Sequence, residues 1–245
     1  MTNLNINIKN KVFPIKIGNV QKENVIFRNL NFKVGLGEFI SIFGPSGCGK
    51  TTLLNLIAGL DNKFNGLITY NQKKAYEEKI SYLFQSPRLF PWLTAQENIE
   101  FPIKKEKNKR KISNKLLKEI GLKKFANSFP NKLSGGMQKR IGLARAFSTN
   151  PKILLLDEPF ISLDNKITNQ LRNLLTNLWK EKKPTIIFVS HDLDEAIQLS
   201  DRIIFLSNLP GKIVLDYKIN VRRPRNVNSL KIKSLKRLLS ASARL

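Results

Sequence analysis

The sequence predicts an α/β fold built on a mostly parallel sheet, and three observations support this class. A glycine-rich loop, Gly44–Thr52, joins an apolar run of strand length to a helical segment. Segments with strand and helix character alternate through the second half of the chain, an order that implies crossover helices between parallel strands. One of these strands, Ile153–Leu156, is wholly apolar and leads into an acidic pair.

The composition fits a globular chain with a sizeable core, because 41% of its 245 residues are hydrophobic. No apolar run approaches the ~20 residues that a membrane-spanning helix needs. The polar, Asn-rich segment Met1–Lys11 does not resemble a secretory signal, so we expect a protein of the cytoplasmic side. Cys48 is the only cysteine, which excludes an intrachain disulfide and fits a reducing compartment.

The formal net charge is +25, from 43 Lys and Arg against 18 Asp and Glu. A nucleic-acid partner or an anionic membrane surface would explain this charge. The codon bias of an AT-rich genome is the favoured explanation, because Lys, Asn and Ile are abundant throughout. The charge is concentrated in Lys104–Lys111, predicted to be a solvated loop, and in the tail Arg222–Arg244, which has no acidic residue.

The first half of the chain changes character at Gln85. Before it, β-branched and aromatic residues predict strands, with one helix running from the glycine-rich loop to near Gly59. After it, prolines and helical periodicity predict a helical insert over residues 86–150. The predicted strands are Val12–Ile17, Val25–Val34, Glu38–Phe43, Phe64–Tyr70 and Lys79–Phe84, and the clearest helices of the insert are Asn114–Ile120 and Gly136–Phe147.

The second half alternates strands and helices. The long segment Asn165–Lys182 has apolar residues at helical spacing, which predicts a helix with one buried face. The tail segment Ser229–Leu239 has a similar pattern, so it either contacts anionic lipid or packs on its own domain or on a permease, and packing is slightly favoured. The remaining elements are strands Lys152–Leu156, Thr185–Val189, Arg202–Leu206 and Lys212–Tyr217 and the helix Leu193–Leu199.

The loop Gly44–Thr52 reads Gly-Pro-Ser-Gly-Cys-Gly-Lys-Thr-Thr and has the strand–loop–helix context of a phosphate-binding P-loop. Its backbone N–H groups can surround phosphate oxygens at a helix N-terminus. We expect Lys50 to reach the terminal phosphates and the Thr51 hydroxyl to hold Mg²⁺. The loop therefore predicts a nucleoside triphosphate bound by Gly44, Pro45, Ser46, Gly47, Cys48, Gly49, Lys50, Thr51 and Thr52.

Three further side chains are expected at the carboxyl edge of the same sheet. Asp157 ends a buried strand and can hold Mg²⁺ directly or through water, while Glu158 can activate an attacking water as a general base. A solvated acidic turn is the alternative, which the accompanying P-loop disfavours. His191, the only histidine, follows the next strand and can bind the terminal phosphate and orient Glu158 or the water.

A second anion-binding geometry begins at Ser134, which precedes Gly135 and Gly136 at a predicted helix start. The alternative is an ordinary serine N-cap. Two phosphate-type sites in one chain need not meet within that chain. They can meet across a head-to-tail dimer in which each nucleotide lies between two copies.

With these motifs in order, the sequence resembles the ATP-binding subunit of an ATP-binding cassette (ABC) transporter over residues 12–225. The resemblance implies a P-loop NTPase (RecA-like) core with an antiparallel β subdomain and an inserted α-helical subdomain. It also implies ATP and Mg²⁺ as ligands. A single ABC ATPase domain, 1–245, would then comprise a core of residues 1–85 and 151–220, a helical subdomain of residues 86–150 and a basic tail of residues 221–245.

By the same resemblance, Gly44–Thr51 is the Walker A loop and Ile153–Glu158 the Walker B strand. Gln85 would link the metal to the membrane partner and join Glu158 and His191 in catalysis, and with Thr51 and Asp157 it would hold Mg²⁺. Leu133–Gln138 would be the signature motif that binds the ATP held by the other subunit. Ser162–Asp164 would lie at the dimer seam.

Finer segments resemble ATPases of nitrate, sulfonate and taurine importers, a group that includes thiamine-precursor uptake systems. The resemblance implies a homodimer on the cytoplasmic face of the cell (inner) membrane that works with a permease and a solute-binding protein, and no nucleic-acid partner. These segments are Phe90–Thr94, Asp157–Phe160, Ser190–Ala196, Pro210–Ile213 and Arg223–Arg225.

One alternative and one departure remain. The alternative, suggested by the high positive charge, is a soluble ABC-type ATPase acting on nucleic acid, and it is disfavoured because the sequence has neither a coiled-coil insert nor a second cysteine for a zinc site. The family stacks an aromatic side chain on adenine about two dozen residues before the P-loop. Here that neighbourhood, Gly18–Lys22, has no aromatic residue, so Phe13 or Phe27 would have to substitute.

Overall fold

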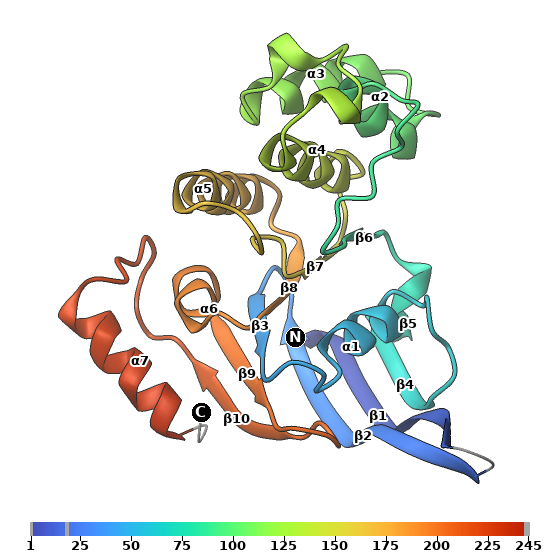
Figure 1. The fold of residues 1–245 in the computed structure, drawn as a ribbon, viewed down its shortest axis with the longest axis vertical. Helices are drawn as coiled ribbons and strands as arrows, with labels where there is room; N and C mark the ends of the chain where they lie inside the picture. The colour runs from blue at the N-terminus through green and yellow to red at the C-terminus, as the bar shows by residue number, and fades with distance from the viewer. Residues whose placement is uncertain (1, 18–19, 243–245) are drawn as a thin grey trace. The chain divides into compact units, whose positions relative to one another are not determined.

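The computed structural model describes residues 2–17 and 20–242, and Figure 1 shows the fold. The predicted adenine neighbourhood at Gly18 and Asn19 and the end of the basic tail at residues 243–245 lie outside the described residues. The chain forms two compact units. The first comprises Met1–Glu78 and Thr185–Leu245, and the second comprises Lys79–Pro184. The predicted helical subdomain, 86–150, falls within the second unit, and its exact limits stay a prediction.

An antiparallel sheet in the first unit has the strand order β2-β1-β4-β5. Strand β1 (Thr2–Ile17) lies between β2 (Val20–Gly35) and β4 (Asn65–Tyr70), and β5 is the short strand Lys73–Lys74. Strand β1 begins ten residues before the predicted strand, because Leu4, Ile6 and Ile8 alternate with polar residues and are all buried. The expected antiparallel β subdomain is confirmed.

A second sheet contributes four strands to the first unit. Strand β3 (Phe39–Phe43) pairs in parallel with both β8 (Thr185–Ser190) and β9 (Arg202–Leu206), and β10 (Ile213–Lys218) is antiparallel to β9. Strands β3 and β8 are buried along their whole lengths, which explains their continuous apolar sequences. Helix α1 (Lys50–Ile57) follows β3, and helix α6 (Leu193–Leu199) follows β8.

The basic tail folds onto the first unit. Helix α7 (Leu230–Ser242) buries Ile232 and Leu239 in an apolar cluster with residues of α6 and β9. Lys236 Nζ lies 2.7 Å from a carboxylate oxygen of Asp194 at the start of α6. Upstream, the buried Arg225 donates to the carbonyl oxygens that end α6. Packing on its own domain, one of the alternatives for this tail, is therefore present in the structure.

The second unit contains the parallel strands β6 (Ile80–Leu83) and β7 (Ile153–Asp157) and helices α2 to α5. Helix α3 begins at Lys109, so the prediction of a solvated loop through Lys111 is wrong for its last three residues. Lys and Arg are good helix formers, and α3 is held by its buried Leu116 and Leu117. The other helices of this unit are α2 (Ala95–Glu100), α4 (Gly135–Ser148) and α5 (Asn165–Lys182). Short 3₁₀ turns occur in this unit at Phe101–Ile103, Lys123–Phe125 and Pro130–Lys132. The first unit has such a turn at Ala75–Glu77.

The long helix α5 matches its predicted bounds and buries Leu171, Leu175 and Leu178, as its apolar spacing indicated. Within the described ranges, residues 2–17 and 20–242, no helix is both long enough and apolar enough to cross a membrane.

Helix α7 offers a matched pair of leucines for a stability test. Leu239 is 0% exposed, whereas its neighbour Leu238 is 53% exposed. We expect Leu239→Ala to lower the free energy of unfolding by about 2–5 kcal/mol, because it leaves a cavity in the core. Leu238→Ala should change it by less than about 0.5 kcal/mol. Urea unfolding followed by circular dichroism measures both, and equal effects would contradict the packing of α7.

Candidate functional site

The glycine-rich loop turns sharply between β3 and α1 because glycine occupies the positions that need it. Gly47 and Gly49 have φ angles of 79° and 102°, a region that side chains disfavour. A Cβ atom on Gly49 would also lie 2.7 Å from Cζ of Phe27, a residue of β2. Glycine at position 49 is therefore required both by the backbone angle and by the close approach of the loop to β2.

Lys50 lies across this loop. Its side chain is buried, and Nζ donates to the carbonyl oxygens of Gly44 and Pro45, each at 2.8 Å. Thr51 is exposed in the first turn of α1, where backbone N–H groups have no partner within the helix. Cation, hydroxyl and N–H donors thus meet at one helix N-terminus, which is the chemistry that anion binding needs.

Cys48 contributes less than its place in the motif indicates. Its side chain is only 1% exposed, and burial raises the pKa of the thiol although the charge of Lys50 opposes the shift. The thiol therefore stays protonated inside the loop. Any contact of Cys48 with a phosphate has to come from its backbone.

His191 leaves the sheet beside the loop. The last residue of β8, Ser190, is in register with Phe43, the last residue of β3, so Gly44 and His191 follow neighbouring parallel strands at one edge. The Ser190 hydroxyl is 2.7 Å from a carboxylate oxygen of Glu195, and Asp192 caps α6. His191 itself is exposed, which argues against a merely structural histidine in the core.

In the second unit, the acidic pair lies at the end of β7, with Asp157 as the last residue of the strand and Glu158 directly after it. Asp157 is 5% exposed, and the Tyr82 hydroxyl of β6 donates to its Oδ2 over 3.4 Å. Burial and the charge of Asp157 raise the pKa of Tyr82, so Tyr82 remains a hydrogen-bond donor. Glu158 is half-buried and has a φ angle of 44°, a left-handed conformation that costs about 1 kcal/mol or more for a residue with a side chain. Gln85 is exposed, two residues beyond the end of β6.

Ser134 is the N-cap of α4, since its Oγ accepts a hydrogen bond from Met137 N at 3.3 Å. The serine N-cap is therefore present. The two glycines that follow differ in their surroundings. A Cβ on Gly136 would lie 2.8 Å from Cγ2 of Ile167 in α5, whereas a Cβ on the exposed Gly135 would meet no atom of the described residues within 4 Å. Packing explains glycine at position 136 but not at position 135.

A buried asparagine that the sequence reading missed holds the segment after Gln85. Asn98 of α2 is fully buried, and its Nδ2 donates to the carbonyl oxygens of Phe90, Leu93 and Thr94 at 2.9–3.1 Å. Its Oδ1 accepts from Phe90 N at 2.8 Å. The segment is thereby fixed while Trp92 remains 69% exposed. The sequence carried no clear signal for this role, because Asn98 is one of four polar residues in the six-residue helix α2.

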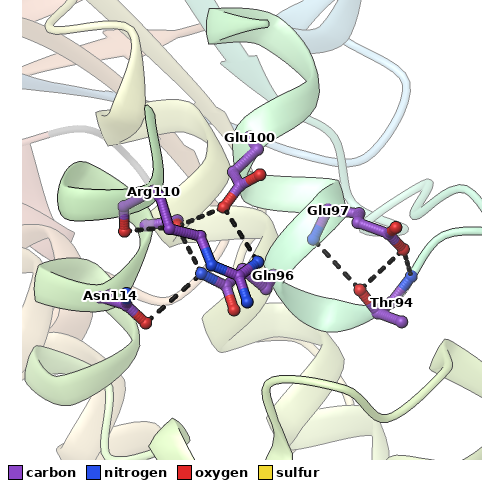
Figure 2. Close-up of polar contacts among 7 residues, drawn as sticks. Thr94, Gln96, Glu97, Glu100, Arg110 and Asn114 are labelled. Atoms are coloured by element: carbon purple, nitrogen blue, oxygen red, sulfur yellow. Dashed lines mark hydrogen bonds and ion pairs between the residues drawn. The ribbon is translucent and has the colours of Figure 1, made fainter. Parts of the chain in front are cut away.

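Figure 2 shows the polar contacts that support α2. Thr94 and Glu97 form a capping box at its start. Near its end, Ser113 of α3 donates to Glu100 over 2.7 Å and accepts from the Gln96 amide at 2.8 Å. These groups are buried and paired, so they fix α2 against α3.

The predicted site residues are divided between the two units. The loop and His191 share one sheet edge in the first unit. In the second unit, Asp157 ends β7, Glu158 follows it, and Gln85 lies two residues beyond β6, the strand that pairs with β7. Ser134–Gly136 begin another element, α4. Over residues 2–17 and 20–242, no group of three or more His, Cys, Asp or Glu side chains is placed to hold a metal.

The comparisons with known proteins agree on one family. The ABC transporter family model matches residues 27–161. The aliphatic sulfonates import ATP-binding protein SsuB of Bacillus thuringiensis subsp. konkukian (strain 97-27) is 41% identical over 95% of this chain and 92% of that protein. The SsuB protein of Bacillus subtilis (strain 168) is 40% identical over 90% of this chain and 86% of its own length.

Solved structures of the ATP-binding cassette MJ0796 are also similar. Its dimeric post-hydrolysis state bound to ADP and Pi is 34% identical with a TM-score of 0.74, and the match covers 89% of this chain and all of that chain. Another dimeric structure of this bacterial ABC transporter cassette has a TM-score of 0.76 at the same identity and coverage. The sequence motifs, the fold and both kinds of relative lead to one conclusion: the chain belongs to the ABC transporter family.

Proposed function

We propose that this chain is the ATP-hydrolysing subunit of an importer for a small nutrient, with an aliphatic sulfonate as the leading candidate. The observation that carries the proposal is the near full-length similarity to sulfonate import ATP-binding proteins. Taurine is itself an aliphatic sulfonate, and nitrate or a thiamine precursor is an alternative cargo for the same type of ATPase. The ATPase acts with a membrane permease, whereas cargo recognition belongs to a separate solute-binding protein.

In this proposal the loop 44–52 binds the triphosphate. The backbone N–H groups at the start of α1 and those of the glycine-rich turn donate to phosphate oxygens. Lys50 replaces the carbonyl oxygens of Gly44 and Pro45 with oxygens of the terminal phosphates, a short movement because its ammonium already lies over the loop. Ser46, Gly47 and Thr52 complete the loop.

Thr51, Asp157 and Gln85 would hold Mg²⁺. Their hydroxyl, carboxylate and amide oxygens are the hard donors that this ion prefers, and its other positions are typically filled by water and phosphate. Asp157 ends its strand as a buried carboxylate, which suits a cation. When bound, Mg²⁺ neutralises charge that develops on the phosphates.

Hydrolysis is assigned to Glu158, with help from His191 and Gln85. Glu158 accepts a proton from water as the water oxygen bonds to the terminal phosphorus, and the bond from that phosphorus to the bridging oxygen breaks. His191 donates a hydrogen bond to the terminal phosphate and orients the water or Glu158. Gln85 precedes the segment Phe90–Thr94, which Asn98 holds, so a shift of Gln85 on nucleotide binding can be transmitted through this segment to the permease.

The signature residues Ser134, Gly135 and Gly136 are proposed to bind the ATP of a second copy in a homodimer. The exposed Gly135 supports this role, because packing within the chain does not demand glycine there. The dimeric cassette structures among the relatives are a precedent. The assembly is proposed to lie on the cytoplasmic face of the membrane, bound to its permease.

Phe13 is the better candidate for the adenine platform. Phe27 is fully buried, and its ring lies against Gly49 and Gly211, so no ring face remains for a base. Phe13 is 39% exposed on the neighbouring strand β1. Phe13 is therefore assigned to stack on adenine, and Phe27 to support the loop from behind.

The variant Glu158→Gln tests the catalytic assignment. Glutamine keeps the shape of the side chain but cannot accept the proton, so we expect ATP hydrolysis to fall by about 10²–10⁴-fold. ATP binding should be retained. The rate of hydrolysis is measured from the phosphate released, and ATP binding is measured by calorimetry. Turnover at the normal rate would remove Glu158 from the mechanism.

A pull-down tests the importer itself. The tagged Glu158→Gln protein, loaded with ATP and treated with nuclease, should recover a multi-span permease from detergent-solubilised membranes of its own cells. The solute-binding protein recovered with it would identify the cargo. Recovery of soluble nucleic-acid-handling proteins alone, with ATPase stimulation by DNA or RNA at physiological salt, would instead support the alternative suggested by the net charge of +25.

The adenine platform is tested with Phe13→Ala. Aromatic stacking contributes about 0.5–1.5 kcal/mol, so the Kd for ATP should rise roughly 2- to 10-fold. Inorganic tripolyphosphate, which lacks the base, should bind as before. Competition against a fluorescent nucleotide gives both constants, and an unchanged Kd for ATP would exclude Phe13 as the platform.

A further inference from the structure

Lys11 of β1 is a buried lysine that no role in phosphate binding explains. Its side chain is 1% exposed. A buried ammonium is costly unless its N–H groups find acceptors. Here Nζ donates to Asp61 Oδ2 at 2.6 Å and to the backbone oxygen of Lys63 at 2.9 Å. The ammonium is thereby held in one place.

The same ammonium lies over the ring of Phe13, with Nζ 4.2 Å from the ring centroid. A cation at this distance is attracted to the negative face of an aromatic ring. Other lysines that lie over a ring, such as Lys74 over Tyr76 at 5.6 Å and Lys183 over Trp179 at 4.5 Å, are exposed. Lys11 differs from them because it is buried and fixed on two oxygen acceptors.

The anchor of Lys11 is tied to the helix of the phosphate loop. Asp61 follows the end of α1, and its backbone N–H donates to Asn55 O of that helix at 3.3 Å. Burial disfavours the ionised Asp61, but the hydrogen bonds from Lys11 and the Lys63 amide outweigh it and hold the pKa of Asp61 below its usual value. The carboxylate therefore stays charged at neutral pH and continues to hold Lys11.

The strand register puts Lys11 behind the loop as well. Lys11 pairs with Phe27 of β2, and the Phe27 ring lies against Gly49. The ammonium, the Phe13 ring and the Phe27 ring therefore belong to the β1–β2 surface that meets the phosphate loop. Lys11 connects the end of α1 to the ring that is proposed to receive the base.

We propose that Lys11 is a positioning residue of the nucleotide site, which holds the Phe13 ring in place and covers one face with positive charge so that adenine stacks on the other. This inference rests on the proposed function, in which Phe13 receives adenine. A cation on one ring face withdraws electron density, so the opposite face repels the electron-rich base less. A ring held in one orientation also loses less side-chain entropy on binding.

The test is the variant Lys11→Met, which keeps the length of the side chain and removes its charge. We expect the Kd for ATP to rise about 2- to 5-fold, and no more than for Phe13→Ala, because Lys11 acts through the Phe13 ring. The Kd for inorganic tripolyphosphate should be unchanged, because that ligand has no base. Equal losses for ATP and tripolyphosphate would show that Lys11 merely supports the loop, and no loss for ATP would also overturn the proposal.

A double-mutant cycle tests whether Lys11 affects ATP binding through the Phe13 ring. In a Phe13→Ala background, Lys11→Met should have little further effect on ATP binding, because the ring through which it acts is gone. Lys11→Arg, which keeps a cation, should recover part of the ATP affinity. A full effect of Lys11→Met without the Phe13 ring would contradict the proposal.

Two further variants complete the design. Lys74→Met removes the exposed lysine over Tyr76 and should leave both Kd values unchanged. If Lys11→Met does not fold, Asp61→Asn replaces it, because this variant weakens the anchor and keeps the lysine. Asp61→Asn should raise the Kd for ATP less than Lys11→Met would and leave the Kd for tripolyphosphate unchanged, whereas an unchanged Kd for ATP would overturn the proposal.

The role of Lys11 and the stacking role of Phe13 can fail separately. If Phe13→Ala leaves the Kd for ATP unchanged, both roles are excluded. If Phe13→Ala raises that Kd and Lys11→Met does not, only the role of Lys11 is excluded.

Discussion

The close approach between the glycine-rich loop and β2 is the constraint on which the first unit depends. The Phe27 ring occupies the space that a side chain at Gly49 would need, and Gly49 itself has a left-handed backbone. The backbone therefore turns tightly enough to bring β3 directly into α1. Lys50 then lies over the loop, and His191 leaves β8 at the same sheet edge. A bulkier residue at position 49 would disturb all of these positions together.

Buried polar groups fix the positions of other segments of the chain. Asn98 holds the segment around Trp92, and Lys11 joins β1 to the end of α1. Each makes several hydrogen bonds to backbone or carboxylate oxygens, so the cost of burial is offset and the geometry becomes specific. In the proposed mechanism, Asn98 and Lys11 position segments near the permease and the nucleotide, and neither side chain contacts the permease or the nucleotide itself.

Much of the fold could be predicted because local patterns are strong. Helices α5 and α6 and strand β9 have the predicted limits, since their apolar periods end at clear turn or cap residues. The start of β1 was predicted too late because Asn and Lys separate its apolar residues, and the start of α3 too late because its first turn is basic. In both places the period of the buried side chains outweighed the average polarity of the segment.

The sequence by itself determined the loop, the acidic pair, the lone histidine and their order, because these motifs depend on residue type and short spacing. It left two aromatic candidates for adenine and two fates for the basic tail. Only the tertiary structure shows that Phe27 is buried, which leaves Phe13 for the proposed adenine contact, and that α7 packs on α6. It also revealed Lys11, whose acceptor Asp61 lies 50 residues away in the sequence, and Asn98, whose backbone acceptors lie four to eight residues earlier. The burial of both side chains depends on segments that folding brings together, so no local pattern shows it.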